Sequence, residues 1–124
     1  MKMYEVLNFQ KIYGVIKDKQ MPLKTVYKMT KVAMKVEEET AFYQEKFNEI
    51  IKEYGQVDEQ GNFVFADDKS FIKIIEGKEE ECNKKVKELT ELEVEMNYKF
   101  TLDELEGLDL TIEQMSMLLP FVEE

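Results

Sequence analysis

The feature that most constrains the fold is a regular row of apolar and semi-apolar residues in the first half of the chain. The row alternates steps of three and four residues: Val26, Met29, Ala33, Val36, Thr40, Tyr43, Phe47, Ile50 and Tyr54. This is the heptad spacing of a helix with one packed face. Pro22 suits a first helical turn, and Gly55 suits the left-handed conformation that often follows the last turn. The sequence therefore predicts one helix over about residues 22–54.

A helix of about 33 residues is roughly 50 Å long, which is more than one small domain covers. We therefore expect its packed face to mediate self-association, with a helix hairpin inside one chain as the alternative. The expected oligomer interface comprises Val36, Tyr43, Phe47, Ile50 and Tyr54. A second apolar row on the N-terminal half, formed by Tyr27, Met34 and Ala41, indicates that this half contacts two neighbours.

The remaining patterns predict a small antiparallel sheet and short helices. Strand candidates are residues 3–7, residues 63–65 after a turn at 58–62, residues 71–75, and residues 94–100, where apolar and polar residues alternate. Asn8 can cap a helix with Phe9 and Ile12 on one face, and a helix of about 16 residues is expected after Gly77. Capping boxes at Thr101 and Thr111 each predict a short helix.

These patterns together predict an α+β fold that is mostly helical, in one domain over residues 1–124. Its parts are the long helix at about 22–54, then a hairpin, helix and strand at about 56–100, and short helices at about 101–120. A chain of 124 residues without a Pro/Gly/Ser-rich linker fits one core.

Charge is distributed unevenly along the chain. The first 35 residues carry eight lysines against two acidic residues, a net charge of +6, whereas residues 36–124 carry a net charge of −16. Such regions can attract a phosphate-bearing ligand, or they can pair with each other between subunits. The net charge of −10 leads us to expect no direct nucleic-acid binding.

The missing residue types exclude several chemistries. The chain has no histidine, and lysines account for all 17 basic residues, so it has no arginine. Without histidine the usual general base and the Ser-His and Cys-His nucleophile pairs are absent, as are His-rich zinc sites. No spacing of carboxylates or lysines indicates an active site. We expect no enzyme, no catalytic residues, no metal and no cofactor.

A basic stripe on the long helix is the candidate ligand site. Lys24, Lys28, Lys31 and Lys35 repeat at steps of four and three residues, roughly opposite the heptad row, and Lys17 and Lys19 precede them. Tyr27 could stack on a nucleotide base, as could Tyr13. The predicted ligand-binding residues are Lys17, Lys19, Lys24, Tyr27, Lys28, Lys31 and Lys35. Alternatively the stripe is a solvated face, or it pairs with the acidic residues 37–39 of an antiparallel copy.

The single cysteine, Cys82, cannot form an internal disulfide, and the N-terminal residues lack the apolar run of a signal peptide or membrane span. Cys82 falls on an apolar helical face, which favours a core position over a reactive thiol. We therefore expect a cytoplasmic protein without membrane association.

Several stretches resemble small, mostly uncharacterised proteins of bacteriophages and prophages of Gram-positive hosts. They are Met21-Pro-Leu-Lys-Thr-Val-Tyr-Lys, Val36-Glu-Glu-Glu, Ile50-Ile-Lys-Glu-Tyr-Gly, the Asp-Glu-Gln-Gly-Asn turn, Thr101-Leu-Asp-Glu-Leu and Leu110-Thr-Ile-Glu-Gln-Met. The resemblance covers most of the chain but consists of helix caps and apolar spacing. It implies a phage setting, inside an infected bacterial cell, and identifies no functional residue.

Two functions follow as hypotheses. The first is a non-enzymatic counter-defence protein, oligomeric through the long helix, that sequesters a host immune nucleotide signal or inhibits a host defence protein. The second is a phage structural or assembly accessory protein that acts through helix-mediated contacts. The first predicts that charge reversals of the basic stripe abolish binding, and the second predicts that apolar changes such as Phe47→Ala matter instead.

Overall fold

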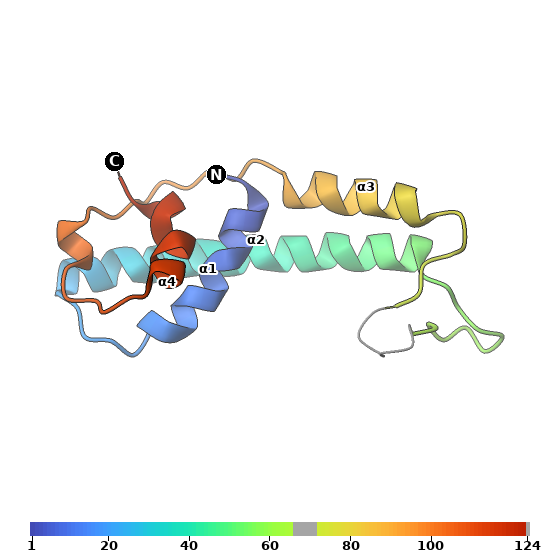
Figure 1. Cartoon of the computed structure of the whole chain (residues 1–124), viewed down its shortest axis with the longest axis horizontal. Helices are drawn as coiled ribbons and strands as arrows, with labels where there is room; N and C mark the ends of the chain where they lie inside the picture. Colours follow the sequence, from blue (N-terminus) through green and yellow to red (C-terminus); the bar gives the residue numbers. More distant parts are fainter. Residues whose placement is uncertain (66–71, 124) are drawn as a thin grey trace. The chain divides into compact units, whose positions relative to one another are not determined.

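The computed structural model describes residues 1–65 and 72–123, and its regular structure is helical. The described residues form four α-helices, which are labelled in Figure 1: α1 (Met3–Ile16), α2 (Leu23–Tyr54), α3 (Glu79–Thr90) and α4 (Ile112–Leu118). Two short 3-10 turns, η1 (Asp103–Leu105) and η2 (Leu119–Phe121), precede and follow α4. The chain groups into two compact units, one formed by Met1–Ala41 with the residues from Leu92 onward, the other by Phe42–Glu91. The long helix lies where the sequence predicted it, and its residues are shared between the two units.

The predicted antiparallel sheet is wrong, because the described residues contain no β-strand. At the strands predicted for 63–65 and 71–75, the described backbone forms only isolated bridges, such as Val57 with Phe63 and Phe65 with Ile72. A strand needs several successive pairs, and these segments turn away after one. Of the predicted strand at 71–75, residue 71 lies outside the described residues.

Residues 3–7 form the start of helix α1 rather than a strand. The buried residues of this helix recur at steps of three and four: Met3, Val6, Phe9, Ile12 and Ile16. Glu5 accepts a hydrogen bond from the backbone N–H of Lys2 at 2.8 Å, which satisfies one of the free amides at the helix start. The apolar run that suggested a strand is therefore the first turn of an amphipathic helix that includes the predicted Phe9 and Ile12 face.

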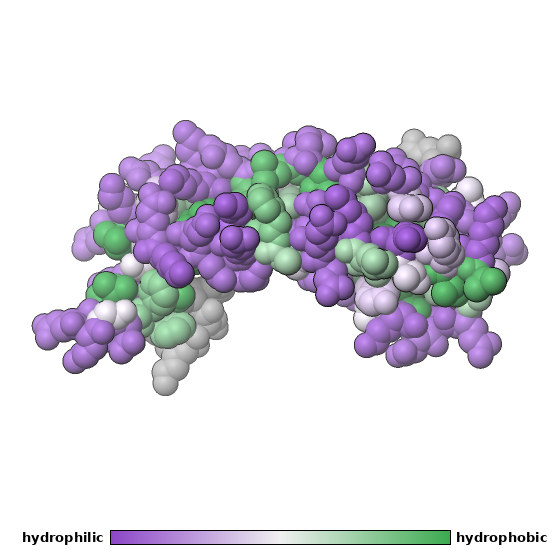
Figure 2. Space-filling model, turned by 180° about the vertical axis from the view of Figure 1, so that it is seen from behind, coloured by the Kyte–Doolittle hydropathy of each residue, from purple (hydrophilic) through white to green (hydrophobic). Residues whose placement is uncertain are grey.

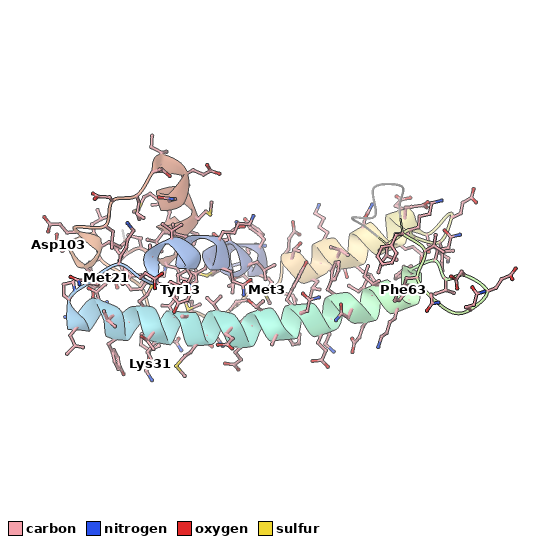
Figure 3. All side chains as sticks on the ribbon, turned by 90° about the horizontal axis from the view of Figure 1, so that it is seen from below. Met3, Tyr13, Met21, Lys31, Phe63 and Asp103 are labelled. Atoms are coloured by element: carbon pink, nitrogen blue, oxygen red, sulfur yellow. The ribbon has the colours of Figure 1, made fainter. Side chains whose placement is uncertain are left out.

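In the first unit, α1 forms the centre of the core. Figure 3 shows α1 between the N-terminal part of α2 and the C-terminal helix α4. The Phe9 ring of α1 lies 4.8 Å, between centroids, from the Phe121 ring of η2, and both side chains are buried. The core of this unit therefore joins the two ends of the chain.

The buried face of α2 overlaps the predicted heptad row but is rotated from it. In the first unit α2 buries Met29 and Val36 of that row together with Thr25 and Val32 outside it, whereas Val26 of the row is 38% exposed. The Thr25 hydroxyl donates a hydrogen bond to the backbone carbonyl of Glu104 at 3.0 Å, which permits its burial. A polar residue therefore occupies one of the positions that face the core.

The segment from Leu92 to Thr101 connects α3 to η1 without regular structure. At one end, the Met3 N–H donates to the Leu92 carbonyl at 2.8 Å and the Val94 N–H donates to the Met1 carbonyl at 2.7 Å. At the other end, Phe100 exchanges backbone hydrogen bonds with the residues of the C-terminus, donating to Phe121 and accepting from Glu123 at 2.7 Å each. Backbone hydrogen bonds thus hold this segment at both ends.

In the second unit, α2 ends at Tyr54 as predicted, but for a different reason. Gly55 is absent from the glycines with positive φ, which are Gly61, Gly77 and Gly107. A Cβ at Gly55 would lie 2.5 Å from the carbonyl oxygen of Ile51 and 2.8 Å from the Phe63 ring. Glycine is therefore required here by close packing rather than by a left-handed conformation.

Three backbone segments meet just after this glycine. The Gln56 N–H donates to Lys73, the Lys73 N–H to Val64, and the Val64 N–H to Gln56, at 2.7, 2.7 and 2.8 Å. The predicted turn precedes Val64: the Asp58 carboxylate accepts from the N–H groups of Gln60 and Asn62 at 2.9 and 3.0 Å. A closed ring of three hydrogen bonds, which we call the backbone triad, takes the place of the predicted hairpin ladder.

The later helices are shorter than predicted. Helix α3 has 12 residues and buries Cys82 and Leu89. Both predicted capping boxes form, since the Thr101 and Thr111 hydroxyls accept from the N–H groups of Glu104 and Gln114 at 3.2 and 3.1 Å. Only the box at Thr111 begins an α-helix, α4, while the other begins the 3-10 turn η1. None of the described helices combines the length and apolar character that a membrane span requires.

Candidate binding cleft

A cleft of about 610 Å³ lies in the first unit where α1 passes α2. Ten residues line it: Phe9, Gln10, Tyr13 and Gly14 from α1, Lys17 immediately after α1, and Thr30, Ala33, Met34, Val36 and Glu37 from α2. This volume lies within the usual range for small-molecule sites. The Tyr13 label in Figure 3 marks the side of α1 that faces α2.

The buried part of the cleft is apolar. Phe9 and Val36 are 1% and 3% exposed, so they form its floor. The half-buried Tyr13 ring stacks on Phe9 with 5.8 Å between centroids and an angle of 25° between the rings. Gly14 leaves a gap in the α1 wall, because a Cβ at this position would have no atom within 4 Å. The floor therefore offers a flat apolar ligand an aromatic surface and room to approach it.

The rim of the cleft is polar and carries both signs of charge. Its exposed residues are Gln10 on α1, Lys17 just after α1, and Glu37 on α2. The Thr30 hydroxyl donates to the Val26 carbonyl at 2.8 Å, and its oxygen keeps the capacity to accept. This rim can hold a ligand with one anionic group near Lys17 and hydrogen-bonding groups elsewhere.

Most of the predicted lysine stripe lies away from this cleft. Successive helical residues turn by about 100°, so Thr30, Ala33 and Glu37 fall on one flank of the buried α2 face. Lys28, Lys31 and Lys35 fall on the other flank. Among the predicted ligand-binding residues, Lys17 alone lines the cleft. Figure 3 places Lys31 on the side of α2 that faces away from α1.

Two lysines of the stripe already have acidic partners. Lys28 Nζ lies 2.8 Å from Glu104 Oε1 and donates to the Lys99 carbonyl at the same distance. Lys35 Nζ lies 2.9 Å from Glu39 Oε1, and this hydrogen bond raises the pKa of Lys35 above its ordinary value. The hydrogen bond from Lys28 is likewise the main cause that lowers the pKa of Glu104, followed by the backbone N–H of Thr101.

The other predicted ligand residues are more accessible. Lys17 and Lys24 are exposed and Lys19 is half-buried. Tyr27 is 58% exposed, and Lys31 Nζ lies 5.5 Å from the centre of its ring. Ligand binding by this group of residues stays a prediction, with its members divided between the cleft and the opposite flank of α2.

The uneven charge of the chain is partly explained by pairing within the first unit. The N-terminal amino group lies 3.3 Å from Glu93, and Lys2 Nζ lies 3.9 Å from the same carboxylate. With the pair of Lys28 and Glu104, basic groups of the N-terminal region contact acidic groups of the C-terminal region. The charge distribution also suggested pairing between subunits, whereas these contacts lie within one chain.

The predicted oligomer interface is also partly used inside the chain. Val36 belongs to the core of the first unit and lines the cleft. Tyr54 is 6% exposed, and Lys85 Nζ of α3 lies 5.3 Å from its ring centre. Tyr43, Phe47 and Ile50 are half-buried, with the Tyr43 and Phe47 rings stacked at 5.8 Å. Self-association through these residues stays a prediction.

Five residues that line the cleft are not among the ligand-binding residues predicted from the sequence: Gln10, Gly14, Thr30, Met34 and Glu37. The one feature of the sequence that could have indicated the cleft is Gly14, which interrupts an otherwise regular amphipathic helix. The place where two helices cross is a tertiary property that local spacing does not reveal.

No cluster of acidic and cysteine residues among the described parts of the chain is arranged to hold a metal ion. Hydrophilic residues cover most of the face shown in Figure 2, and hydrophobic residues reach it in separate groups. No protein-family model, curated protein or solved structure matches this chain.

Proposed function

We propose that the protein is a non-enzymatic binding protein that holds a small ligand in the cleft between α1 and α2 and withholds it from other proteins. The observation that carries this proposal is the cleft itself, with its aromatic floor and a rim that includes Lys17. A planar ring would pack against Tyr13 and Phe9, and an anionic group would approach Lys17. A nucleoside monophosphate has this combination of groups.

The charges of the rim restrict the ligand. Among the described residues, Lys17 is the one cation that lines the cleft, and Glu37 opposes the approach of additional negative charge. The lysines that would be needed for a polyphosphate lie on the other flank of α2, and Lys28 and Lys35 have carboxylate partners. A ligand with a single phosphate therefore fits this cleft better than a polyphosphate does.

The sequence resemblance to small phage proteins suggests a biological context in which sequestering a ligand is useful, namely phage infection. A phage protein that retains a host nucleotide signal would blunt the defence of the infected cell. We retain this counter-defence role as the proposed purpose of ligand capture. The absence of catalytic groups in the cleft favours capture over conversion of the ligand.

The proposal is tested by titrating the protein with adenosine 5′-monophosphate and, as an uncharged probe, adenosine, following amide shifts by NMR. We expect Tyr13→Ala to weaken the binding of both probes. Lys17→Glu should weaken the binding of the monophosphate at least tenfold more than the binding of adenosine. Lys11→Glu is the matched control, because Lys11 is an exposed lysine of α1 that does not line the cleft. Equal binding by the unchanged protein and the cleft variants would contradict this function. It would also be contradicted if neither probe binds and protein isolated from cells retains no small molecule.

A second candidate function is an assembly accessory protein, and exposed apolar residues near the C-terminus favour it. Ile112 and Leu119 are 89% and 54% exposed, and their spacing of seven places them on one side of α4 and η2. Such residues are typical of a protein contact. This candidate predicts a stoichiometric protein partner that is lost in Ile112→Glu, while Lys17→Glu leaves it bound.

A further inference from the structure

Most backbone N–H and C=O groups of the connecting segment at residues 95–99 make no hydrogen bond with the described residues. The N–H groups of Glu95, Met96, Asn97, Tyr98 and Lys99 have no hydrogen-bond partner among the described residues, and the single carbonyl in use is that of Lys99, which accepts from Lys28 Nζ. Exposure alternates along the segment, because residues 95, 97 and 99 are exposed whereas residues 94, 96, 98 and 100 are buried or half-buried. This alternation is that of an extended strand with one solvated face.

The two edges of this segment differ. Successive N–H groups of an extended chain point to opposite edges, so residues 94 and 100 share one edge and residues 95, 97 and 99 share the other. The first edge is held at its ends by the hydrogen bonds of Val94 with Met1 and of Phe100 with Phe121 and Glu123. The second edge, which we call the open edge, carries the N–H and C=O groups of residues 95, 97 and 99.

We propose that the open edge pairs with the open edge of a second copy of this chain, in antiparallel register centred on Asn97. In that register Asn97 exchanges two hydrogen bonds with its counterpart, and Glu95 and Lys99 each exchange two with the opposite residue. All the groups used belong to the open edge. The Lys99 carbonyl can accept from its new partner as well as from Lys28, because a carbonyl oxygen has two lone pairs.

Charge complementarity selects a second copy as the occupant. The register centred on Asn97 places Glu95 of each chain opposite Lys99 of the other, on the solvated face, so that two ion pairs flank a central pair of asparagines. A shift by two residues in either direction removes both of these pairs. One of the two shifts places Lys99 opposite Glu93 instead, but that carboxylate already has the N-terminal amino group and Lys2 as partners. The interface is the same patch on both chains, as a twofold dimer requires.

This pairing also accounts for the sequence pattern. The alternation from Val94 to Phe100 is that of a half-buried strand, although this segment pairs with a single residue at each end within its own chain. An unpaired extended edge is a site at which another strand adds. The inference is independent of the proposed ligand cleft, which lies between α1 and α2.

The test compares the mass of the full chain in solution with that of charge variants, using sedimentation equilibrium over a hundredfold range of concentration. We expect a species of twice 14.7 kDa. Glu95→Lys and Lys99→Glu each place like charges opposite each other and should weaken the dimer at least tenfold. The double variant Glu95→Lys/Lys99→Glu restores opposite charges and should restore the dimer. Glu88→Lys, an exposed site on α3, controls for net charge.

Hydrogen exchange gives a second measurement on the unchanged protein. Protection of the amides of Glu95, Asn97 and Lys99 should rise with protein concentration, while that of Met96 and Tyr98 should not. A monomer at all concentrations, a dimer that the double variant fails to restore, or equal dissociation by Glu88→Lys would overturn the proposal. A monomer that gains the same protection only when another protein is added would also overturn it, since the edge would then serve a different partner.

Discussion

Lys28 Nζ on α2 lies 2.8 Å from Glu104 Oε1, the carboxylate that also accepts the N–H of Thr101 at the start of η1. The two side chains are 25% and 13% exposed. The backbone carbonyl of Glu104 in turn accepts from the buried Thr25 hydroxyl at 3.0 Å. Glu104 therefore connects the C-terminal segment to α2 through both its side chain and its main chain.

The first prediction concerns acid stability. Because hydrogen bonds from Lys28 and Thr101 lower the pKa of Glu104 below its ordinary value of 4.5, its ionised form stabilises the folded state. That contribution is complete above the ordinary value and is lost as pH falls through the lowered pKa. Glu104→Gln should therefore reduce the free energy of unfolding at pH 7, and the difference from the unchanged protein should shrink below about pH 4.5, as measured by urea denaturation.

The matched control for that prediction is Glu106→Gln, an exposed glutamate next to η1 without an ion pair among the described residues. Its unfolding should follow that of the unchanged protein at every pH. Equal behaviour of the two variants would show that the Lys28 contact contributes nothing to acid stability.

The second prediction compares a glycine in crowded surroundings, Gly55, with one beside open space, Gly14. Gly55→Ala should destabilise the protein by about 1–3 kcal/mol, since the added Cβ would lie 2.5 Å from a backbone carbonyl. Gly14→Ala should stabilise it by about 0.5–1 kcal/mol, because α1 has open space at this position and alanine favours the helix. Thermal melting followed by circular dichroism measures both, and a shift of the same sign in the two variants would contradict the packing at Gly55.

The third prediction tests which face of α2 is buried. Val32→Asp should abolish cooperative unfolding of the first unit, because a carboxylate without a partner would enter a position that is 0% exposed. Val26→Asp, at a position of the predicted heptad row that is 38% exposed, should change stability by less than about 1 kcal/mol. Chemical denaturation distinguishes them, and the reverse order of severity would restore the row predicted from sequence.

The fourth prediction concerns Cys82. The side chain is 3% exposed, and burial raises the pKa of its thiol above the ordinary value of 9.0. A thiol reagent at pH 8 should therefore label the folded protein at least tenfold more slowly than the urea-unfolded protein. Rapid labelling without denaturant would mean that α3 opens readily. Leu89→Ala, which removes another buried side chain of α3, should accelerate labelling.

The long helix could be predicted because its signals are local. A Pro22 start, a Gly55 stop and a heptad row between them are sufficient to give α2 within one residue at its start. The orientation of its buried face depends on which neighbours cover it. Here Thr25 and Val32 are buried because α1 and the C-terminal residues pack on that side, and Thr25 is a polar residue that pattern analysis would place on the surface.

The sheet could not be predicted correctly because a strand is defined by its partner. Residues 94–100 do alternate in exposure as predicted, yet the described chain supplies neighbours only at the two ends. Residues 3–7 are a short apolar run compatible with either structure, and the continuation to Phe9 and Ile12 decides for helix. Lys17 was recognised as a candidate ligand residue, but the α2 residues opposite it were not, because their proximity comes from the helix crossing.

The backbone triad of Gln56, Val64 and Lys73 has a dynamic consequence. Each of its three residues donates one hydrogen bond within the triad and accepts one, so displacement of any one segment breaks two of the three bonds. The three amide groups should therefore become accessible to solvent in one shared opening event, with one common exchange rate, instead of fraying one after another from an end as paired strands do.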